Sequence, residues 1–440
     1  MTTRLTRSLG LWELVCIGII LVQPTAPMPL FGVVQQEAHG HVVTAILLAM
    51  VAMLFTAISY GRMARAHPRA GSAYTYVGQE IHPALGYVTG WSMLMDYVLN
   101  PLICTIWCSK AAMNIVPLIP YWAWAVFFAA LFTGLNLRNI RATARINAAL
   151  AIAMGMVILA VLIASTRYVM GLPGLGMAYF SAPFYDPQTF SWPLVATGTS
   201  VAVLTYIGFD GISTLSEEVV DPRRNILLAT VLICLTIGLL SAVEVYAAQL
   251  VWPAHEPFPD LDTAYVHVAG RIGGPILFQL VNLTLLVASI GSGSGGQLAG
   301  ARLLYGMGRD NALPRSFFGV LDTRSHIPRN NVLLIGAICL IGAFVMTYQL
   351  GAEMLNFGAF IGFMGVNVSS FLHDYVRSQK KTISNLLPPL AGFVTCLAMW
   401  LSLRTAAKMF GFMWLLIGVL YGVWRTRSFR DPIRFEAPPE

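Results

Sequence analysis

The chain has 440 residues, of which 57% are hydrophobic and only 11% are charged, and its formal net charge is +7. Soluble domains carry about 25% charged residues, and a soluble fold of this composition would expose large apolar patches that aggregate. These values exclude an ordinary soluble globular protein. A nucleic-acid-binding protein is not expected either, because the basic residues form no basic face on a soluble module.

The apolar residues come in long blocks. A transmembrane helix needs roughly 20 apolar residues in sequence, and in lipid each backbone amide must find its partner within the protein. The sequence therefore predicts an all-α membrane protein with about twelve transmembrane helices, estimated from block length. The expected helices span residues 11–34, 40–61, 84–113, 121–137, 146–166, 193–218, 226–250, 274–300, 331–348, 352–372, 384–403 and 409–424.

Basic residues alternate strongly between successive loops. One set of loops, together with the two termini, holds 22 of the 27 lysines and arginines, whereas the other set holds only Arg167, Arg271, Arg404 and Lys408. Because basic loops stay in the cytoplasm, this alternation predicts a multi-pass protein of the cell inner membrane with both termini cytoplasmic. Residues 1–10 lack a small-residue cleavage site, so the first helix is expected to be an uncleaved anchor.

The first and sixth predicted helices are interrupted in mid-course. Residues 24–29 contain three prolines, and residues 206–211 contain two glycines beside Asp210. Prolines remove helix donors and glycines weaken a helix. Paired breaks at matching places in two halves of a chain indicate the substrate site of a transporter. The alternative is a pair of ordinary kinks, since both residue types are common in membrane helices.

The eighth predicted helix contains a run of serines and glycines at residues 289–297. A nucleotide phosphate loop is not expected, because no Lys-Ser or Lys-Thr ending follows the run. Two interpretations stay open. The small residues either let neighbouring helices approach closely or line a cavity with their hydroxyl groups.

Several ionisable residues fall inside the predicted helices, where charges are costly and usually functional. Asp210 lies at the second break and could bind a substrate amine, carry a proton or cap the following half-helix. Glu217 and Glu218 are candidates for ion coupling or for structural ion pairs with nearby arginines. The other deep candidates are Asp96, Lys110 and Glu244.

An enzyme is not expected. No His-Glu-x-x-His sequence occurs, and no Ser-His-Asp set can be assigned from the sequence. The six cysteines lie in apolar stretches and form no metal-ligand cluster, so they are interpreted as small apolar residues. The sequence thus predicts no cofactor and no metal.

Five motifs together resemble the amino acid–polyamine–organocation (APC) superfamily, and within it the bacterial putrescine importers. The resemblance runs from about Leu11 to the last predicted helix. The motifs are Phe55-Thr56-Ala57-Ile58-Ser59-Tyr60-Gly61, Ala70-Gly71-Ser72-Ala73-Tyr74-Thr75-Tyr76, Gly208-Phe209-Asp210 with Thr214-Leu215-Ser216-Glu217-Glu218, Arg302-Leu303-Leu304-Tyr305-Gly306-Met307-Gly308-Arg309-Asp310-Asn311, and Asn356-Phe357-Gly358-Ala359.

The resemblance implies a LeuT-type fold, with inverted repeats at residues 11–168 and 193–373 and two additional helices at 384–424. It implies uptake driven by an ion gradient, with a proton or a sodium ion as the coupling ion. The candidate coupling residues are Asp210, Asp96, Glu217 and Glu218. By motif, the expected substrate-binding residues are Thr25, Ala26, Pro27, Met28, Phe31, Tyr97, Tyr206, Ile207, Gly208, Phe209, Asp210, Asn356 and Phe357.

The chain departs from the family pattern at the breaks. Many members have a Gly-Ser-Gly-type run at the first break, whose amides hold a substrate carboxylate, but here the run is rich in proline. The resemblance also implies an aspartate in the first break of putrescine importers, where this chain has Pro29. Some members carry a lysine midway along the fifth helix, where this chain has Met154. With Asp210 as the one carboxylate at either break, one hypothesis is that the substrate is an amino acid or a monoamine and that putrescine binds poorly. The alternative is that Pro29 merely shifts the loop and another acid takes the place of the missing aspartate.

The sequence as a whole predicts a secondary transporter of amino acids or related amines that works by alternating access, with proton symport as its coupling. One alternative is an exchanger that trades one amine for another. A second is a membrane receptor of the same fold that binds without transport, and the third is a membrane-embedded enzyme.

Overall fold

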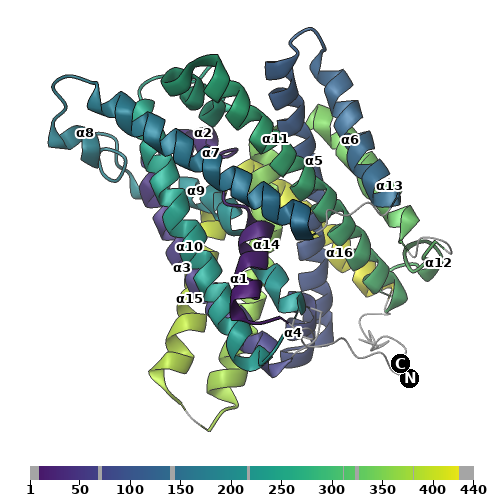
Figure 1. Ribbon diagram of the computed structural model, residues 1–440. Helices are drawn as coiled ribbons and strands as arrows, with labels where there is room; N and C mark the ends of the chain where they lie inside the picture. The colour runs from purple at the N-terminus through teal and green to yellow at the C-terminus, as the bar shows by residue number, and fades with distance from the viewer. Residues whose placement is uncertain are drawn as a thin grey trace.

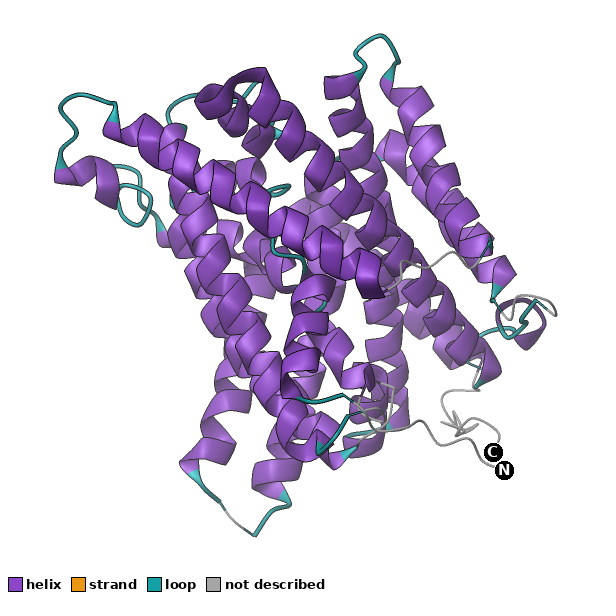
Figure 2. Cartoon of the chain, viewed as in Figure 1, coloured by secondary structure: helices purple, strands orange, loops and turns teal. Residues whose placement is uncertain are grey.

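The computed structural model describes residues 9–67, 72–138, 144–215, 219–310, 312–322, 327–379 and 381–425. These residues are almost entirely helical and contain no β-strand (Figure 2). Each of the twelve expected spans overlaps a helix. The long helices are α3 (Val42–Ala66), α5 (Pro83–Ile115), α6 (Tyr121–Leu137), α7 (Ala144–Met170), α10 (Pro222–Val251), α11 (Ala264–Arg309), α13 (Arg329–Val345), α14 (Tyr348–Phe371), α15 (Ile383–Ser402) and α16 (Thr405–Arg425).

The first and sixth expected helices are divided, as predicted. The first forms α1 (Leu11–Val22) and α2 (Phe31–Glu37), and the sixth forms α9 (Trp192–Ala202) followed by the short 3₁₀ segments η1 (Val203–Tyr206) and η2 (Phe209–Leu215). Short helices outside the expected spans are α4 (Ser72–Glu80), α8 (Met177–Ser181), α12 (Arg315–Phe318) and the π-helical turn η3 (Leu372–Val376).

Length and composition of the helices indicate a membrane protein. Within the described residues, eight helical segments are long and apolar enough to cross a membrane, and α1, α6 and α13 are shorter apolar helices. Many large apolar side chains on the outer helices are exposed, among them Ile152 and Leu416, as expected for surfaces that face lipid. The chain is therefore a multi-pass membrane protein.

The serine and glycine run in α11 is continuous helix. The one residue of α11 with non-helical backbone angles is Gly274, with φ 62°, which precedes Pro275 and lies well before the run. A Cβ added at Gly293 would come within 2.9 Å of the Cβ of Cys104, and one at Gly296 would overlap the side chain of Asn100. These glycines therefore let α11 pack closely on α5, which is the packing interpretation, and no phosphate loop forms.

The broken helices lie at the centre of the bundle (Figure 1). Helix α1 packs against α10 and η2, while α3 packs along α10. Helix α5 packs against both α11 and α14 on the other side of the centre. The two breaks are therefore enclosed by helices from both halves of the chain.

Ion pairs gather at the two ends of the bundle. At one end, Arg62 Nη1 lies 3.8 Å from Asp374 Oδ2, and Arg377 binds Glu80. At the other end, Lys110 Nζ lies 2.7 Å from Asp262 Oδ2 and 3.3 Å from Asp260 Oδ1. Lys110, one of the deep charges in the sequence, is thus a structural cation near the mouth of the bundle.

Candidate functional site

The first break is a compact loop of turns between α1 and α2. Gln23 ends α1 with φ 72°, a left-handed conformation. The N–H groups of Ala26, Met28 and Phe31 donate to the carbonyls of Gln23, Thr25 and Met28, respectively. Pro24, Pro27 and Pro29 have no amide hydrogen. Most of the backbone donors in this loop are therefore absent or already used.

The second break is formed at Ile207 and Gly208. The backbone of Gly208 has φ 112°, a conformation that glycine adopts readily and other residues rarely do. A Cβ at Gly208 would lie 3.4 Å from the carbonyl oxygen of Leu21 and 3.6 Å from the Cα of Val22. The second break thus lies directly against the end of α1, and the two breaks meet at one place.

Asp210 lies at this meeting point and is almost fully buried, with 6% of its surface exposed. The backbone N–H groups of Gly208 and Gly211 hydrogen-bond to its carboxylate. Its own carbonyl accepts a hydrogen bond of 2.6 Å from Ser213 Oγ. The carboxylate therefore caps the start of η2 and at the same time faces the centre of the bundle.

A second buried carboxylate lies nearby. Asp96 on α5 is only 3% exposed and is close enough to Asp210 for the two charges to interact. The phenol of Tyr97 on α5 interacts with both aspartates, and so does the phenol of Tyr60 on α3. The structure thus brings Asp210 together with Asp96 and Tyr97, which the sequence analysis placed on a different helix.

Sequence reasoning did not identify Tyr60 as a site residue, although it belongs to one of the family motifs. Its ring is fully buried and packs edge-on against Phe209, with centroids 5.4 Å apart, and against Tyr76 and Phe363. Its hydroxyl has no hydrogen-bond partner among the described residues. A buried tyrosine normally finds a partner for its hydroxyl, so Tyr60 has a donor available beside the two aspartates.

Other predicted site residues hold the helices in place. Tyr206 donates from its hydroxyl to the carbonyl of Ile46 on α3 at 2.9 Å. Asn356 donates to the carbonyl of Ser200 at 2.7 Å, which attaches α14 to α9. The ring of Phe357 packs against Trp400 and Phe412, with centroids 5.0 and 5.4 Å away. Phe357 therefore faces α15 and α16 rather than the breaks, and we do not count it among the substrate contacts.

The remaining predicted residues fall into two groups. Thr25, Pro27, Met28 and Phe31 are buried in or beside the first break, while Ala26 and Ile207 are partly exposed. The coupling candidates Glu217 and Glu218 lie outside the described residues.

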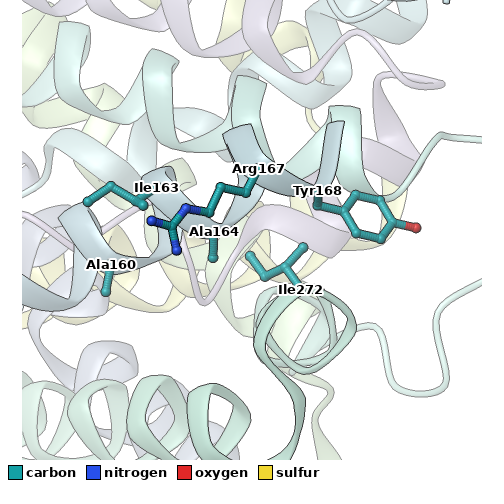
Figure 3. Close-up of a pocket in the computed structure, with 6 residues that line it drawn as sticks. All are labelled: Ala160, Ile163, Ala164, Arg167, Tyr168 and Ile272. Atoms are coloured by element: carbon teal, nitrogen blue, oxygen red, sulfur yellow. The ribbon is translucent and has the colours of Figure 1, made fainter. Parts of the chain in front are cut away.

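The open pocket drawn in Figure 3 is remote from this chemistry. It has a volume of about 540 Å³ and lies between α7 and the start of α11. It is lined by Ala160, Ile163, Ala164, Arg167, Tyr168 and Ile272. None of these residues belongs to either break, and none is acidic, so the pocket is not taken as the functional site.

A cluster of histidine and glutamate side chains connects α3, α4 and η3, and the sequence analysis did not foresee it. Glu80 Oε1 lies 2.5 Å from His67 Nε2 and 3.0 Å from His373 Nδ1, and its Oε2 accepts from Arg377 at 2.5 Å. Two histidines and a carboxylate at these distances could hold a metal ion. Arg377 already neutralises the carboxylate, however, so we interpret the cluster as an ion-pair network.

We expect Glu80→Gln to lower the thermal stability of the detergent-solubilised protein by several degrees at neutral pH. Burial raises the pKa of Glu80, but hydrogen bonds and charges from His67 and His373 outweigh burial and hold the pKa below its ordinary value. Such a group stabilises the fold above its unfolded pKa, and this contribution is lost as the pH falls through its folded pKa. Thermal melts should therefore differ at pH 7, begin to converge below about pH 4, near the ordinary glutamate pKa, and coincide once the pH has fallen below the folded pKa of Glu80. Asp374→Asn, in a more exposed ion pair, serves as the control; an equal effect of both changes at pH 7 would contradict the account.

Comparison with known proteins agrees with this geometry. Residues 28–429 match the model of the family described as "Amino acid permease". The chain belongs to the amino acid permease family. This permease is 34% identical over 441 residues to a low-affinity putrescine importer of Escherichia coli strain K12, covering 98% of this chain and 96% of that protein.

Two further relatives differ in what their names say they carry. The permease is 27% identical to a branched-chain amino acid permease of Lactococcus lactis, with 92% of each chain covered. It is 23% identical to a methylthioribose transporter of Bacillus subtilis, covering 94% of this chain and 92% of the relative. The relatives are transporters rather than enzymes, so membership indicates transport but leaves the substrate to be argued from the site.

Proposed function

We propose that this permease imports organic amines, with a diamine as the best-fitting substrate, by symport with protons. The observation that carries the proposal is the pair of buried aspartates, Asp96 and Asp210, that interact beside the two helix breaks. Burying two ionised carboxylates in a dry site costs much free energy unless a cation neutralises them. A substrate with two ammonium groups satisfies both, which revises the hypothesis of a single-amine substrate that the sequence suggested.

The charges of the protein interior favour a cation in general. Among the residues whose side chains the structure describes, no lysine or arginine is buried. The buried charged side chains are Glu80, Asp96, Asp210, Glu244, Asp262, Asp310 and Glu353. Neither aspartate of the site therefore has a buried basic residue to neutralise it, and a positively charged substrate or a proton must do so.

The first break favours an amine over an amino acid. A substrate carboxylate needs backbone or side-chain donors in a dry site. In residues 24–31, three prolines have no N–H group and three other N–H groups are used by turns within the loop. The loop therefore has few donors for a carboxylate, whereas its carbonyl oxygens suit an ammonium group.

For the transport cycle we propose the LeuT-type layout of twelve transmembrane helices. Residues 11–168 and 193–373 would form the two inverted repeats and residues 384–424 the two additional helices. In this layout Thr25, Met28, Phe31, Tyr97 and Phe209 would line the site with the two aspartates, and the surrounding helices would rock around it. The buried state of Asp96 and Asp210 fits a conformation closed on both sides.

We expect both termini to lie in the cytoplasm, because loops rich in lysine and arginine alternate with loops that hold few. A fluorescent protein that folds only in the cytoplasm, fused after Glu440, should fluoresce. Alkaline phosphatase, which folds only outside the cytoplasm, should be inactive at the same position. An active phosphatase fusion would overturn the orientation.

An exchanger of amines remains the second candidate function, because several members of a family can share a site and differ in coupling. A proton symporter and an exchanger differ in whether uptake into liposomes requires substrate inside. A symporter accumulates labelled substrate in liposomes that contain no substrate, when a pH gradient is applied. An exchanger takes up label only when the liposomes are preloaded.

Binding by purified protein tests the substrate class directly. Putrescine, ornithine and butylamine form a matched set, because ornithine is putrescine with an added carboxylate and butylamine is putrescine without one amine. Putrescine should raise the melting temperature most, since a ligand that binds only the folded state stabilises it by mass action. A larger shift with ornithine or leucine than with putrescine would contradict the proposal.

A further inference from the structure

Glu244 is buried in the last third of α10 without a counter-charge. Its side chain is 0% exposed, and neither carboxylate oxygen has a hydrogen-bond partner among the described residues. Charged groups without partners are rare within membrane spans and usually take part in function. From the sequence, neither Glu244 nor Lys110 could be assigned a partner. The structure pairs Lys110 with Asp260 and Asp262, whereas Glu244 forms no ion pair among the described residues.

Among the described side chains, no cation is close enough to neutralise Glu244. Helix α10 packs against α3, α1, α7, α11 and the segments η1 and η2. Of the ionisable side chains on these elements, the phenol of Tyr265 on α11 is the one described group found to interact electrostatically with Glu244. Asp210 in η2 interacts instead with Cys234, which lies ten residues before Glu244 in α10, a separation of about 15 Å at the usual helical rise.

Tyr265, which interacts with Glu244, and the residues just before it also contact the half-helix after the first break. The ring of Tyr265 packs edge-on against Phe31, the first residue of α2, with centroids 5.6 Å apart. A Cβ at Gly32 would overlap the carbonyl oxygen of Leu261, so α2 lies directly on this segment. The hydroxyl of Tyr265 has no hydrogen-bond partner among the described residues. Closure of α2 and burial of Glu244 therefore involve the same residues.

We propose that Glu244 carries the coupling proton of this permease. The inference rests on the proposed proton symport. When residues 252–265 are displaced and water reaches α10, the Glu244 carboxylate binds one proton from the outer solution. The resulting neutral acid is far less costly to bury than an ionised carboxylate, so Tyr265 and α2 can close over it together with the substrate. Release of that proton on the cytoplasmic side regenerates the carboxylate and completes the cycle.

The variant Glu244→Gln tests this role in proteoliposomes with labelled putrescine. Glutamine has the shape of the protonated acid but cannot exchange a proton. We expect counterflow between preloaded and external putrescine to persist, because loaded carriers still change sides. Accumulation driven by a pH gradient should fall to the level of protein-free liposomes. The alkalinisation of a weakly buffered outer solution that accompanies wild-type uptake should also disappear.

Glu353→Gln is the matched control. Glu353 on α14 is also buried, at 1% exposed, but Arg404 Nη1 lies 4.0 Å from its Oε1. Because Arg404 supplies a nearby counter-charge, the Glu353→Gln variant should still accumulate putrescine and alkalinise the solution. Accumulation by Glu244→Gln at the wild-type level, or loss of its counterflow together with accumulation, would overturn the inference.

Two further measurements separate the possible failures. Absence of counterflow in the wild type would refute the proposed function itself, whereas wild-type counterflow with a coupled Glu244→Gln variant refutes only the role of Glu244. If Glu244→Gln aggregates on size-exclusion chromatography, Tyr265→Phe replaces it. Loss of the phenol that faces Glu244 should shift the pH at which accumulation is half-maximal, and an unchanged pH profile would contradict the proposal.

Discussion

Asp210→Asn is expected to abolish most amine uptake while leaving the amount of folded protein in the membrane near normal. Loss of one partner of a buried charge pair costs about 2 to 5 kcal/mol, which corresponds to roughly a 30-fold to several-thousand-fold loss of affinity. Asp210 is 6% exposed and lies where both breaks meet, so its contact with a substrate ammonium would be of this kind. Initial uptake rates over a range of putrescine concentrations measure the effect.

Asparagine also distinguishes the possible roles of Asp210. Its side-chain oxygen caps a helix start about as well as that of aspartate, so a residue that only caps η2 would tolerate the change. Near-wild-type uptake by Asp210→Asn would therefore reduce Asp210 to a cap. Asp186→Asn, in the loop between α8 and α9, should have no effect on uptake and controls for expression and handling.

Asp96→Asn is expected to change selectivity more than overall transport. If Asp96 and Asp210 each bind one ammonium group, the variant should lose about tenfold or more for putrescine, since one charged hydrogen bond is worth roughly 1.5 to 3 kcal/mol. Butylamine, which has one ammonium group, should be affected much less. The ratio of the two inhibition constants against labelled putrescine should thus approach one.

The losses that Asp96→Asn causes for putrescine and for butylamine show whether Asp96 binds a second ammonium group. Equal losses for putrescine and butylamine in Asp96→Asn would show that Asp96 does not bind a second ammonium group and serves the site in another way. Tyr97→Phe, which removes only a hydroxyl beside both aspartates, should keep the wild-type preference for putrescine. A preference for butylamine in the wild type would contradict the two-ammonium model directly.

The helices and their breaks could be predicted because their causes are local. Apolar blocks of membrane length require helices, and the run around Pro24, Pro27 and Pro29 cannot continue one. Gly208 likewise marks the second break through its positive φ. The extra short helices α4, α8 and α12 were not predicted, because they lie in polar loops without a long periodic pattern.

The site could be predicted only in part, because it depends on contacts between distant segments. Asp210 was identified from its place beside a break, Asp96 from its charge within a span, and Tyr97 from the family resemblance. The role of Tyr60 depends on Asp210, which is 150 residues away in the chain, and nothing in its local sequence distinguishes it from a packed core residue. Phe357 shows the converse, since its motif indicated the site but its ring packs on Trp400. The isolation of Glu244 also became visible only in three dimensions.

Counterflow of labelled putrescine in proteoliposomes tests the central claim that this permease carries organic amines. Liposomes preloaded with unlabelled putrescine should accumulate the label transiently. External putrescine should compete more strongly than butylamine or ornithine, because butylamine leaves one of the two aspartates unpaired and ornithine adds a carboxylate for which the first break has few donors. Absence of counterflow with every amine, or stronger competition by ornithine or leucine than by putrescine, would contradict the account.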